Sequence, residues 1–368
     1  MKKSLIIDCM ALLGSLTGIG RYNYEITQIL SRLEHYDLSF FYGYTSKHFI
    51  NPKSSSPARF TRKILIKNYF LKRMLRKFLY CFNALARTSY DLYWQPNFIP
   101  LRQIKAKKII ASVHDFSWEN FPQYHPKERI DYFKNNFYHA IKYCDHLITG
   151  TLFTKNEIIE RTGFSPDKIS VIYHGVNHAL FYPRKPSDQH NSFILAVGSI
   201  EPRKNLKNLL LAYAALELSL KQRYALILVG AEGWQNSEIM SLIKALSPFV
   251  HYSGYVTDEQ LAQLYSDASL FIYPSFYEGF GIPPLEAMAC GAPVICSNTS
   301  TLPEVCADAA YYVDPHDCQA ITESIKTVLH DESLKMLLRK KGLAHSQQFS
   351  WEKSAMEHHS LFQKLLQD

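Results

Sequence analysis

Short apolar runs of strand length alternate with helical segments along the chain, and this alternation limits the fold more than any other feature of the sequence. In the amino half we expect strands at residues 5–10, 38–44, 91–94, 108–113, 146–149 and 169–173. In the carboxyl half we expect them at residues 193–197, 224–229, 270–273, 293–297 and 310–313. Such alternation is typical of α/β proteins. The sequence therefore predicts two doubly wound parallel sheets.

A stretch without periodicity separates the two halves. Residues 182–191 are rich in proline and polar residues that break regular structure, which is typical of a linker. We therefore expect residues 1–185 and residues 186–350 to form two Rossmann-like domains. The 368 residues are enough for two domains that each have a core.

The cysteines and the apolar runs indicate a protein of the reducing cytosol. The seven cysteines are an odd number without C-x-x-C spacing, so neither a disulfide framework nor a zinc site is expected. Asp8 interrupts the first apolar run, which we interpret as a strand and not as a signal peptide. No apolar run approaches the roughly 20 residues that a membrane-spanning helix requires.

Positive charge is concentrated in the amino half. The formal net charge is +8, and no acidic residue occurs between Asp37 and Asp91. In the basic segment 59–87, a helix over residues 71–85 would have an apolar face and a basic face, the latter with Lys72, Arg73, Arg76 and Lys77. This pattern favours attachment to an anionic inner-membrane surface, and an ordinary core-packing helix is the alternative. No nucleic-acid-binding module is visible, so we do not expect a nucleic acid partner.

Two glutamates flank a strand-to-helix loop in the carboxyl half. Glu278 and Glu286 follow the strand expected at residues 270–273, with seven residues between them. Two prolines favour the first turn of a helix over residues 284–290, and Gly291 suits its C-terminal stop. The loop therefore lies at the carboxyl edge of a sheet, where α/β proteins bind ligands.

Anion-binding groups occur at this edge in two places. The backbone of Gly279, Phe280, Gly281 and Ile282, with the helix N-terminus, would suit a diphosphate, whereas the two carboxylates would suit hydroxyl groups. Arg203 and Lys204 follow the strand expected at residues 193–197. Two fixed cations suit a pyrophosphate leaving group.

Four segments along the chain resemble the retaining glycosyltransferases of the GT-B fold, family 4. They are the glycine segment Thr17-Gly-Ile-Gly-Arg-Tyr22, the histidine segment Val113-His114-Asp115, the pair Arg203 and Lys204, and the E-x7-E pattern of Glu278 and Glu286. The resemblance covers nearly the whole chain. It implies an acceptor-binding amino-terminal domain, a nucleotide-sugar-binding carboxyl-terminal domain, an active site in the cleft between them, and a last helix at residues 351–368 that crosses back to the first domain.

The resemblance also implies roles around the donor. Glu286, in the first turn of its helix, would accept hydrogen bonds from the ribose hydroxyls, and a carboxylate that complements the helix dipole is the plain alternative. Glu278 would face the donor hexose or the positive charge at its anomeric carbon. Arg203 and Lys204 would neutralise the diphosphate as the sugar leaves, in place of a metal ion, so no metal or other cofactor is expected.

Further candidates have weaker signals. Gly18 and Gly20, read as part of a loop, would allow close approach of the backbone to phosphate or sugar, although a plain turn also explains them. Arg21 could add charge on this side of the cleft, near the acceptor. Thr301 and Glu304 are expected near the diphosphate side of the carboxyl-terminal domain.

The histidine segment and one loop complete the candidate site. His114 would hydrogen-bond a donor hydroxyl, unless it is a structural histidine satisfied by Asp115. Asp115 could instead contact the acceptor. Tyr255 and Val256 would read the nucleotide base through their backbone, or form a plain loop. His174 stands where the family more often has asparagine and receives no role.

Within the family, Glu201-Pro-Arg-Lys-Asn205 and His114-Asp115 look most like bacterial O-antigen mannosyltransferases. This likeness implies transfer of an α-mannosyl residue from GDP-mannose to a lipid-linked saccharide at the cytoplasmic face of the inner membrane. The same fold could use a UDP-sugar, such as UDP-glucose or UDP-N-acetylglucosamine. The non-enzyme alternative is a membrane-bound scaffold, which is disfavoured by the complete set of Arg203, Lys204, Glu278 and Glu286.

Overall fold

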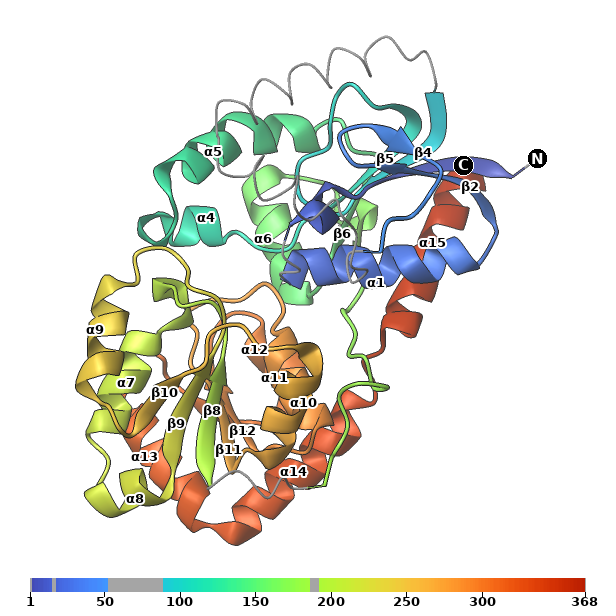
Figure 1. The fold of residues 1–368 in the computed structure, drawn as a ribbon. Coiled ribbons are helices and arrows are strands. Elements are labelled where there is room, and N and C mark those ends of the chain that lie inside the picture. The colour runs from blue at the N-terminus through green and yellow to red at the C-terminus, as the bar shows by residue number, and fades with distance from the viewer. Residues whose placement is uncertain (1, 15–17, 52–88, 186–191, 368) are drawn as a thin grey trace.

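The computed structural model describes residues 2–14, 18–51, 89–185 and 192–367. The basic segment 59–87 lies outside these ranges. Figure 1 shows two domains, each with its own sheet between layers of helices. This arrangement confirms the predicted α/β class.

The sheet of the amino-terminal domain has the order β3-β2-β1-β4-β5-β6-β7 in the described residues. Its strands are β1 (Lys3–Asp8), β2 (Tyr36–Phe41), β3 (Thr45–Ser46), β4 (Ser89–Gln95), β5 (Lys105–Ser112), β6 (His146–Thr149) and β7 (Ile169–Val171). β3 runs antiparallel to β2. The predicted parallel sheet therefore carries one antiparallel edge strand, because the chain reverses through Gly43, at φ 90°, instead of crossing over.

Helices cover both faces of this sheet. They are α1 (Gly18–Arg32), α4 (Ser117–Asn120), α5 (Lys127–Ile141) and α6 (Leu152–Thr162), with the 3-10 turns η1 (Met10–Leu13), η2 (Pro122–Tyr124) and η3 (Pro166–Lys168). Leu5 and Ile7 share a core with α1, whereas Ala111 and Leu147 pack with α5 and α6. Central strands are apolar on both faces because both faces are buried.

The sheet of the carboxyl-terminal domain has the order β10-β9-β8-β11-β12-β13 in the described residues. Its strands, all parallel, are β8 (Phe193–Val197), β9 (Ala225–Val229), β10 (Val250–Tyr252), β11 (Leu270–Tyr273), β12 (Val294–Ser297) and β13 (Tyr311–Val313). The order reverses between β8 and β11, so the loops after these strands diverge, and α/β sheets bind ligands at such a point.

The helices of this domain lie on both faces of its sheet (Figure 1). They are α7 (Leu206–Ala214), α8 (Leu218–Arg223), α9 (Ser237–Ala245), α10 (Asp258–Asp267), α11 (Ile282–Ala289), α12 (Leu302–Cys306), α13 (Cys318–His330) and α14 (Glu332–Ser346), with η4 (Pro202–Lys204) and η5 (Ala307–Ala309).

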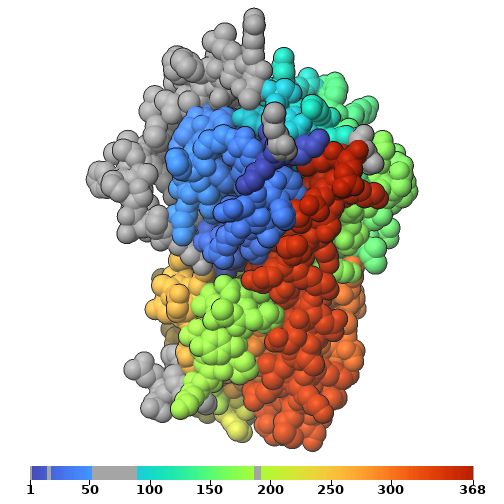
Figure 2. Space-filling view, turned by 90° about the vertical axis from the view of Figure 1, so that its right-hand side faces the viewer, coloured from blue at the N-terminus to red at the C-terminus, as the bar shows by residue number. Residues whose placement is uncertain are grey.

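The last helix, α15 (Trp351–Gln367), packs against the amino-terminal domain. Figure 2 shows this carboxyl-terminal segment, in red, running up from the lower domain along the upper one. Trp351, Ala355 and Phe362 are buried in the same core as Leu5 of β1. Across the described ranges, no helix has both the length and the apolar character needed to cross a membrane.

Most predicted strands are confirmed. β6, β8 and β11 have the predicted bounds, and the other predicted strands differ by a few residues at their ends. β3 and β10 were not predicted, because two or three residues are too short to show a periodic pattern.

Candidate active site

Two glycines shape the loop between β11 and α11. Gly281 has φ 105°, which an L side chain rarely adopts. Gly279 packs against the other domain, where an added Cβ would lie 2.2 Å from the backbone oxygen of His114. This part of the loop therefore lies directly at the junction of the two domains.

The helix after this loop begins earlier than predicted. It was expected over residues 284–290, but α11 spans Ile282–Ala289, because prolines are tolerated within the first turn as well as at its start. Glu286 therefore lies beyond the first turn, which contains no acidic residue. The expected first-turn position of Glu286 is wrong. The alternative that Glu286 only complements the helix dipole therefore loses support. Gly291 follows the helix at φ 82°, as its predicted role as a stop requires.

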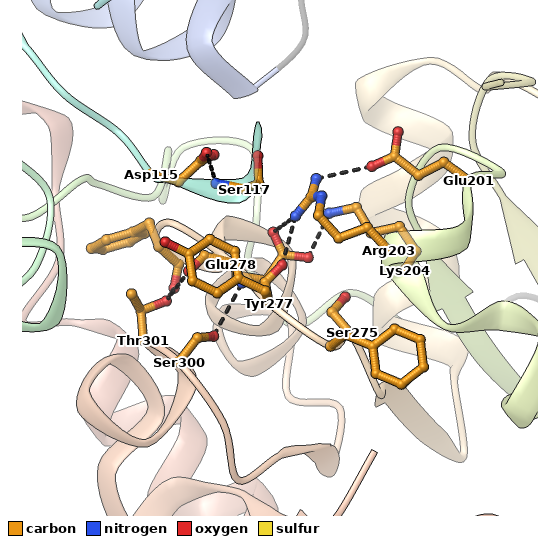
Figure 3. Close-up of polar contacts among 12 residues, drawn as sticks. Asp115, Ser117, Glu201, Arg203, Lys204, Ser275, Tyr277, Glu278, Ser300 and Thr301 are labelled. Atoms are coloured by element: carbon orange, nitrogen blue, oxygen red, sulfur yellow. Dashed lines mark hydrogen bonds and ion pairs between the residues drawn. The ribbon is translucent and has the colours of Figure 1, made fainter. Parts of the chain in front are cut away.

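Arg203 and Lys204, on η4 after β8, converge on Glu278 (Figure 3). Lys204 Nζ lies 2.6 Å from Glu278 Oε1, and Arg203 Nη1 lies 3.1 Å from Glu278 Oε2. Arg203 also forms an ion pair of 2.9 Å with Glu201, and Lys204 donates to the Tyr273 hydroxyl at 2.8 Å. The site thus contains two cations that are already paired with two carboxylates.

Burial makes these charges interact strongly. Burial raises the pKa of Glu278, but Lys204 and Arg203 outweigh this effect and lower the pKa to about 2. Burial is also the largest influence on Lys204, whose pKa is lowered although Glu278 opposes the shift. The Glu278 carboxylate is therefore ionised throughout the neutral range.

Glu286, on α11, has a different environment from Glu278, which lies in the loop before this helix. Its side chain is 5% exposed, and the Tyr265 hydroxyl lies 3.3 Å from its Oε2 atom. Burial raises the pKa of Glu286 to about 7, against the opposing charge of Arg21. Two glutamates of one motif therefore differ in charge state near neutral pH, because only Glu278 has cations within hydrogen-bonding distance.

The glycine segment forms a helix start. Gly18 and Gly20 lie in the first turn of α1, so the reading of these residues as a loop is wrong. A Cβ at Gly18 would meet no atom within 4 Å. Arg21, on the same turn, forms an ion pair of 2.7 Å with Asp258 of α10. Its charge also acts on Glu286, so Arg21 lies on the Glu286 side of the junction and joins the two domains.

His114 is held by a backbone carbonyl. Its Nε2 atom lies 2.7 Å from the oxygen of Pro96 and must carry the proton, since a carbonyl oxygen only accepts. The alternative that Asp115 satisfies this histidine is therefore wrong. Asp115 instead accepts a hydrogen bond of 2.8 Å from the backbone of Ser117 at the start of α4. Burial lowers the pKa of His114, which keeps the ring neutral.

The predicted base-reading loop joins β10 to α10. Tyr255 is 69% exposed, whereas Val256 packs against the core of the carboxyl-terminal domain. Thr257 caps α10 through a reciprocal capping box with Gln260. Before Tyr255, the backbone oxygen of Gly254 accepts a hydrogen bond of 2.9 Å from the backbone of Gly230. The loop backbone is thus anchored on both sides of Tyr255, and its role in binding a base stays a prediction.

Several contacts at the junction had no signal in the sequence. Tyr277 donates to Glu157 of α6 and accepts from the backbone N–H of Phe116 at 3.0 Å. Glu304 was expected on the diphosphate side, but it accepts hydrogen bonds from the backbone of Leu152 and Phe153 at 2.6 and 2.9 Å. That expectation is wrong, because α12 presents Glu304 to the N-terminus of α6 in the other domain.

Three further residues at the loop show how it is supported. The Thr301 hydroxyl lies 3.1 Å from the backbone oxygens of both Glu278 and Phe280. The Phe280 ring packs on His174, with 4.5 Å between ring centroids. His174, which received no role, is therefore a packing partner of the loop. The one indication in the sequence was that a histidine stands here where the family more often has asparagine.

His125 lies close to the charged residues without having been predicted. It is 6% exposed, and neither ring nitrogen has a hydrogen-bond partner. Burial lowers its pKa, and Arg129 and Arg203 lower the pKa further. A buried imidazole whose pKa is lowered stays neutral and can accept a hydrogen bond.

The arrangement can bind an anion and stabilise negative charge that develops on it. Arg203 and Lys204 supply fixed positive charge, and the loop before α11 supplies backbone N–H groups. No group of three or more His, Cys, Asp or Glu side chains suited to a metal ion occurs within the described ranges. A diphosphate-containing substrate fits these groups better than a neutral one.

Two family models together match nearly the whole chain. Residues 16–180 match the model described as Glycosyltransferase Family 4, and residues 181–346 match the model described as Glycosyl transferases group 1. The O-antigen chain mannosyltransferase B of Escherichia coli is 35% identical over 365 residues, which cover 92% of this chain and 93% of that protein. The O-antigen chain mannosyltransferase RfbU of Salmonella typhimurium is 34% identical over 221 residues, or 59% of this chain and 60% of that protein.

Solved structures share the fold. Sucrose-phosphate synthase from Thermosynechococcus elongatus superposes with a TM-score of 0.75 at 22% identity, over 99% of both chains. WaaG, a glycosyltransferase involved in lipopolysaccharide biosynthesis, superposes with a TM-score of 0.68 at 15% identity, over 97% of this chain and 99% of that one. At these identities the likeness concerns the arrangement of the two domains only.

Proposed function

The chain is a GT-B enzyme that belongs to glycosyltransferase family 4, and on this premise we propose that it transfers an α-mannosyl residue from GDP-mannose to a lipid-linked saccharide in the synthesis of a bacterial O-antigen or related surface polysaccharide. The observation that carries the proposal is the 35% identity to an O-antigen mannosyltransferase over nearly the full length of both chains. The donor diphosphate would occupy the junction of the domains, beside the loop before α11.

The charged residues support this reaction. The diphosphate of the donor would take Arg203 and Lys204 as partners, which would offset the negative charge that grows as the sugar leaves. Glu278 would then turn its carboxylate to the hexose hydroxyls and the positive charge at the anomeric carbon. Glu286 would accept hydrogen bonds from the ribose hydroxyls, and the new bond would keep the α configuration of the donor.

The acceptor and the place of reaction are part of the same proposal. A lipid-linked acceptor lies in the membrane, so the enzyme would act at the cytoplasmic face of the inner membrane through its basic segment 59–87. Liposomes test this. Wild type should bind anionic liposomes at low salt, and a variant with Lys72, Arg73, Arg76 and Lys77 replaced by Glu should not. Equal binding of the two proteins would refute the attachment.

Incubation with labelled GDP-mannose and lipid-linked saccharides tests the reaction. We expect product that carries the label, and we expect GDP to stabilise the protein more than UDP does. Ligand at a hundred times its dissociation constant should stabilise by about 2.7 kcal/mol. Preferential stabilisation by UDP, with turnover of a UDP-sugar, would refute the donor while leaving the transferase activity intact.

A further inference from the structure

Tyr277 belongs to the carboxyl-terminal domain, but its side chain packs in the other domain. It directly precedes Glu278 in the loop before α11 and is 4% exposed. Its ring packs against Phe121 and Phe153 of the amino-terminal domain, with 5.7 and 6.2 Å between ring centroids. Figure 3 shows Tyr277 beside Glu278 and Arg203. The loop before α11 therefore carries an aromatic side chain across the junction, next to the charged groups of the site.

The Tyr277 hydroxyl joins two elements of the amino-terminal domain. It donates a hydrogen bond to Glu157 of α6 and accepts one of 3.0 Å from the backbone N–H of Phe116, two residues after His114. Burial and the charges of Asp115 and Glu157 raise the pKa of Tyr277, so the hydroxyl keeps its proton and is the donor to Glu157. A phenylalanine ring would pack here as well, so it is the hydroxyl that gives the contact its direction.

Glu157 is a fixed acceptor for this hydroxyl. Its side chain is 8% exposed, and its Oε1 atom accepts from Asn120 Nδ2 at 2.8 Å and from Arg161 Nη2 at 3.2 Å. The Arg161 guanidinium lies in turn over the Phe116 ring, 5.0 Å from its centroid. The Oε2 atom of Glu157 is the one that accepts from Tyr277. A buried oxygen that loses its donor is unfavourable, so Tyr277 and Glu157 hold each other in place.

The backbone of Tyr277 is part of the charged site. Its carbonyl oxygen accepts a hydrogen bond of 2.7 Å from Arg203 Nη1, and the same Nη1 atom lies 3.1 Å from Glu278 Oε2. The Glu278 backbone N–H donates to the Ser300 hydroxyl at 3.1 Å. One nitrogen of Arg203 therefore contacts both Tyr277 and Glu278, so a shift of Tyr277 changes the alignment of this ion pair.

Two other contacts between the domains involve different elements. Arg21 of α1 pairs with Asp258 of α10, and Glu304 of α12 accepts from the backbone at the start of α6. Tyr277 differs from these residues because its side chain binds the amino-terminal domain while its backbone binds Arg203. A movement of one domain relative to the other is thereby transmitted to the cation that the proposed function assigns to the diphosphate.

We propose that Tyr277 is a positioning residue, whose hydroxyl makes the alignment of Arg203 and Glu278 depend on the contact between the loop before α11 and the amino-terminal domain. The proposal rests on the proposed function, because it concerns the groups that would act on the donor diphosphate and hexose. Without the hydroxyl, the same charges stay in the site but lose their alignment. Small misplacements of groups at a reacting centre lower the rate strongly, whereas binding of the nucleotide depends on them less.

Tyr277→Phe tests the proposal, because it removes the hydroxyl and keeps the ring. We expect kcat at saturating donor and acceptor to fall about 10-fold, while the dissociation constant of GDP, measured by calorimetry, changes less than about twofold. The matched control is Tyr213→Phe, which removes a buried hydroxyl whose acceptors, the backbone oxygens of Tyr224 and Phe249, lie in the carboxyl-terminal domain. It should keep kcat within about twofold of wild type. An unchanged kcat in Tyr277→Phe would overturn the proposal, as would a loss of GDP binding as large as the loss of kcat.

A double-mutant cycle tests the partner of the hydroxyl. Glu157→Gln leaves one acceptor oxygen where Tyr277 and Arg161 each need one, and it should lower kcat by a similar factor. The double variant should lose less than about twofold beyond either single variant, because both changes remove the same contact. Losses that multiply as if the two sites were independent would overturn the proposal. If Glu157→Gln does not fold, Asn120→Ala, which removes another donor to Glu157, takes its place in the cycle.

A measurement without turnover separates this proposal from the proposed function. In Tyr277→Phe without donor, hydrogen exchange followed by mass spectrometry should show faster exchange of the backbone N–H groups at residues 276–282 than in wild type, with exchange in α10 unchanged. Equal exchange at residues 276–282 in the two proteins would overturn the proposal. Should wild type use a UDP-sugar instead of GDP-mannose, the donor of the proposed function fails, and the ratios of kcat among the variants, measured with that UDP-sugar, still decide the role of Tyr277.

Discussion

At the scale of single residues, the candidate site is a set of buried charges that compensate one another. Arg203 and Lys204 are paired with Glu278, and Arg203 is also paired with Glu201. Buried ions are tolerated when each has a partner, and removing one partner leaves the other uncompensated. A diphosphate can enter such a site because it replaces one anionic partner of the cations by another.

The first prediction concerns the cation with the shortest contact to Glu278. Lys204→Ala should lower kcat by about 10²-fold or more, because negative charge on the leaving diphosphate grows in the transition state. The exposed Lys207, on the next helix, is the control, and Lys207→Ala should keep full activity. Transfer rates with saturating donor provide the measurement. Full activity of Lys204→Ala would contradict the electrostatic role of Lys204. A strict requirement for added metal would contradict the inference that Arg203 and Lys204 act in place of a metal ion.

The second prediction concerns the protonation of Glu286. Its pKa of about 7 means that in the free enzyme the Glu286 carboxyl group is mostly protonated at pH 6 and mostly ionised at pH 8. Ribose hydroxyls donate to the ionised form, so GDP-mannose should bind roughly 10-fold more tightly at pH 8 than at pH 6. Calorimetry at both pH values measures this, and the dependence should vanish in Glu286→Gln.

The same shift affects folding. The folded state keeps a proton on Glu286 that the unfolded chain releases near pH 4.3, so the free energy of unfolding contributed by this residue falls as pH rises from about 4.3 to about 7. Urea midpoints of wild type and Glu286→Gln should therefore diverge across this window. Parallel pH profiles of the two proteins would contradict the raised pKa.

At the scale of elements, the backbone N–H groups at the start of α6 have hydrogen-bond partners in both domains. Thr151 caps its own helix by accepting from the backbone of Thr154, and Glu304 accepts from the next backbone N–H groups, those of Leu152 and Phe153. The Tyr173 hydroxyl also donates to Glu304, at 2.9 Å. The unpaired N–H groups of a helix N-terminus and its dipole both favour a carboxylate at this place. One side chain of α12 thus ties the carboxyl-terminal domain to a helix of the other.

The third prediction follows from this contact. Glu304→Ala should lower the free energy of unfolding by about 1–3 kcal/mol, since charged hydrogen bonds to backbone groups are lost. It should also weaken the association of the domains, which limited proteolysis would report as faster cleavage between them. Glu323→Ala removes an exposed glutamate of α13 and serves as the control. A Glu304→Ala protein as stable and protease-resistant as wild type would contradict the role.

At the scale of the whole molecule, α15 makes the two domains parts of one structure. The helix begins at Trp351, directly after the carboxyl-terminal domain, and Phe362 near its end is fully buried in the core of the other domain. His358 Nδ1 donates to the backbone oxygen of Ser354, so its Nε2 atom must accept from the Tyr22 hydroxyl, 2.6 Å away. Apolar packing and a directed hydrogen bond therefore both join α15 to α1.

The fourth prediction tests the contribution of this packing. Phe362→Ala should lower the free energy of unfolding by about 3–5 kcal/mol, because it leaves a cavity in the amino-terminal core. Met356→Ala, on the same helix but 44% exposed, should change it little. Urea denaturation followed by circular dichroism is the measurement. A loss below about 1 kcal/mol for Phe362→Ala would show that α15 does not stabilise this domain.

Much of the fold could be predicted because its signals are local. Strands such as β6, β8 and β11 are runs of neighbouring apolar residues, and Gly291 marks the end of α11 through its own backbone preference. Residues at strand ends, among them Arg203 and Glu278, could be assigned to one sheet edge for the same reason. The helix starts at Gly18 and Ile282 were missed, because several positions are compatible with the same boundary signals.

The sequence by itself determined the α/β class, the two halves and the edge at which the charged residues gather, since each depends on residues close together in the chain. Only the tertiary structure decided which groups meet across the domains: Arg21 with Asp258, Tyr277 with Glu157, and Glu304 with α6. These partners lie far apart in sequence. It also decided that Glu278 and Glu286 differ in pKa, because that difference depends on burial and on which cations lie nearby.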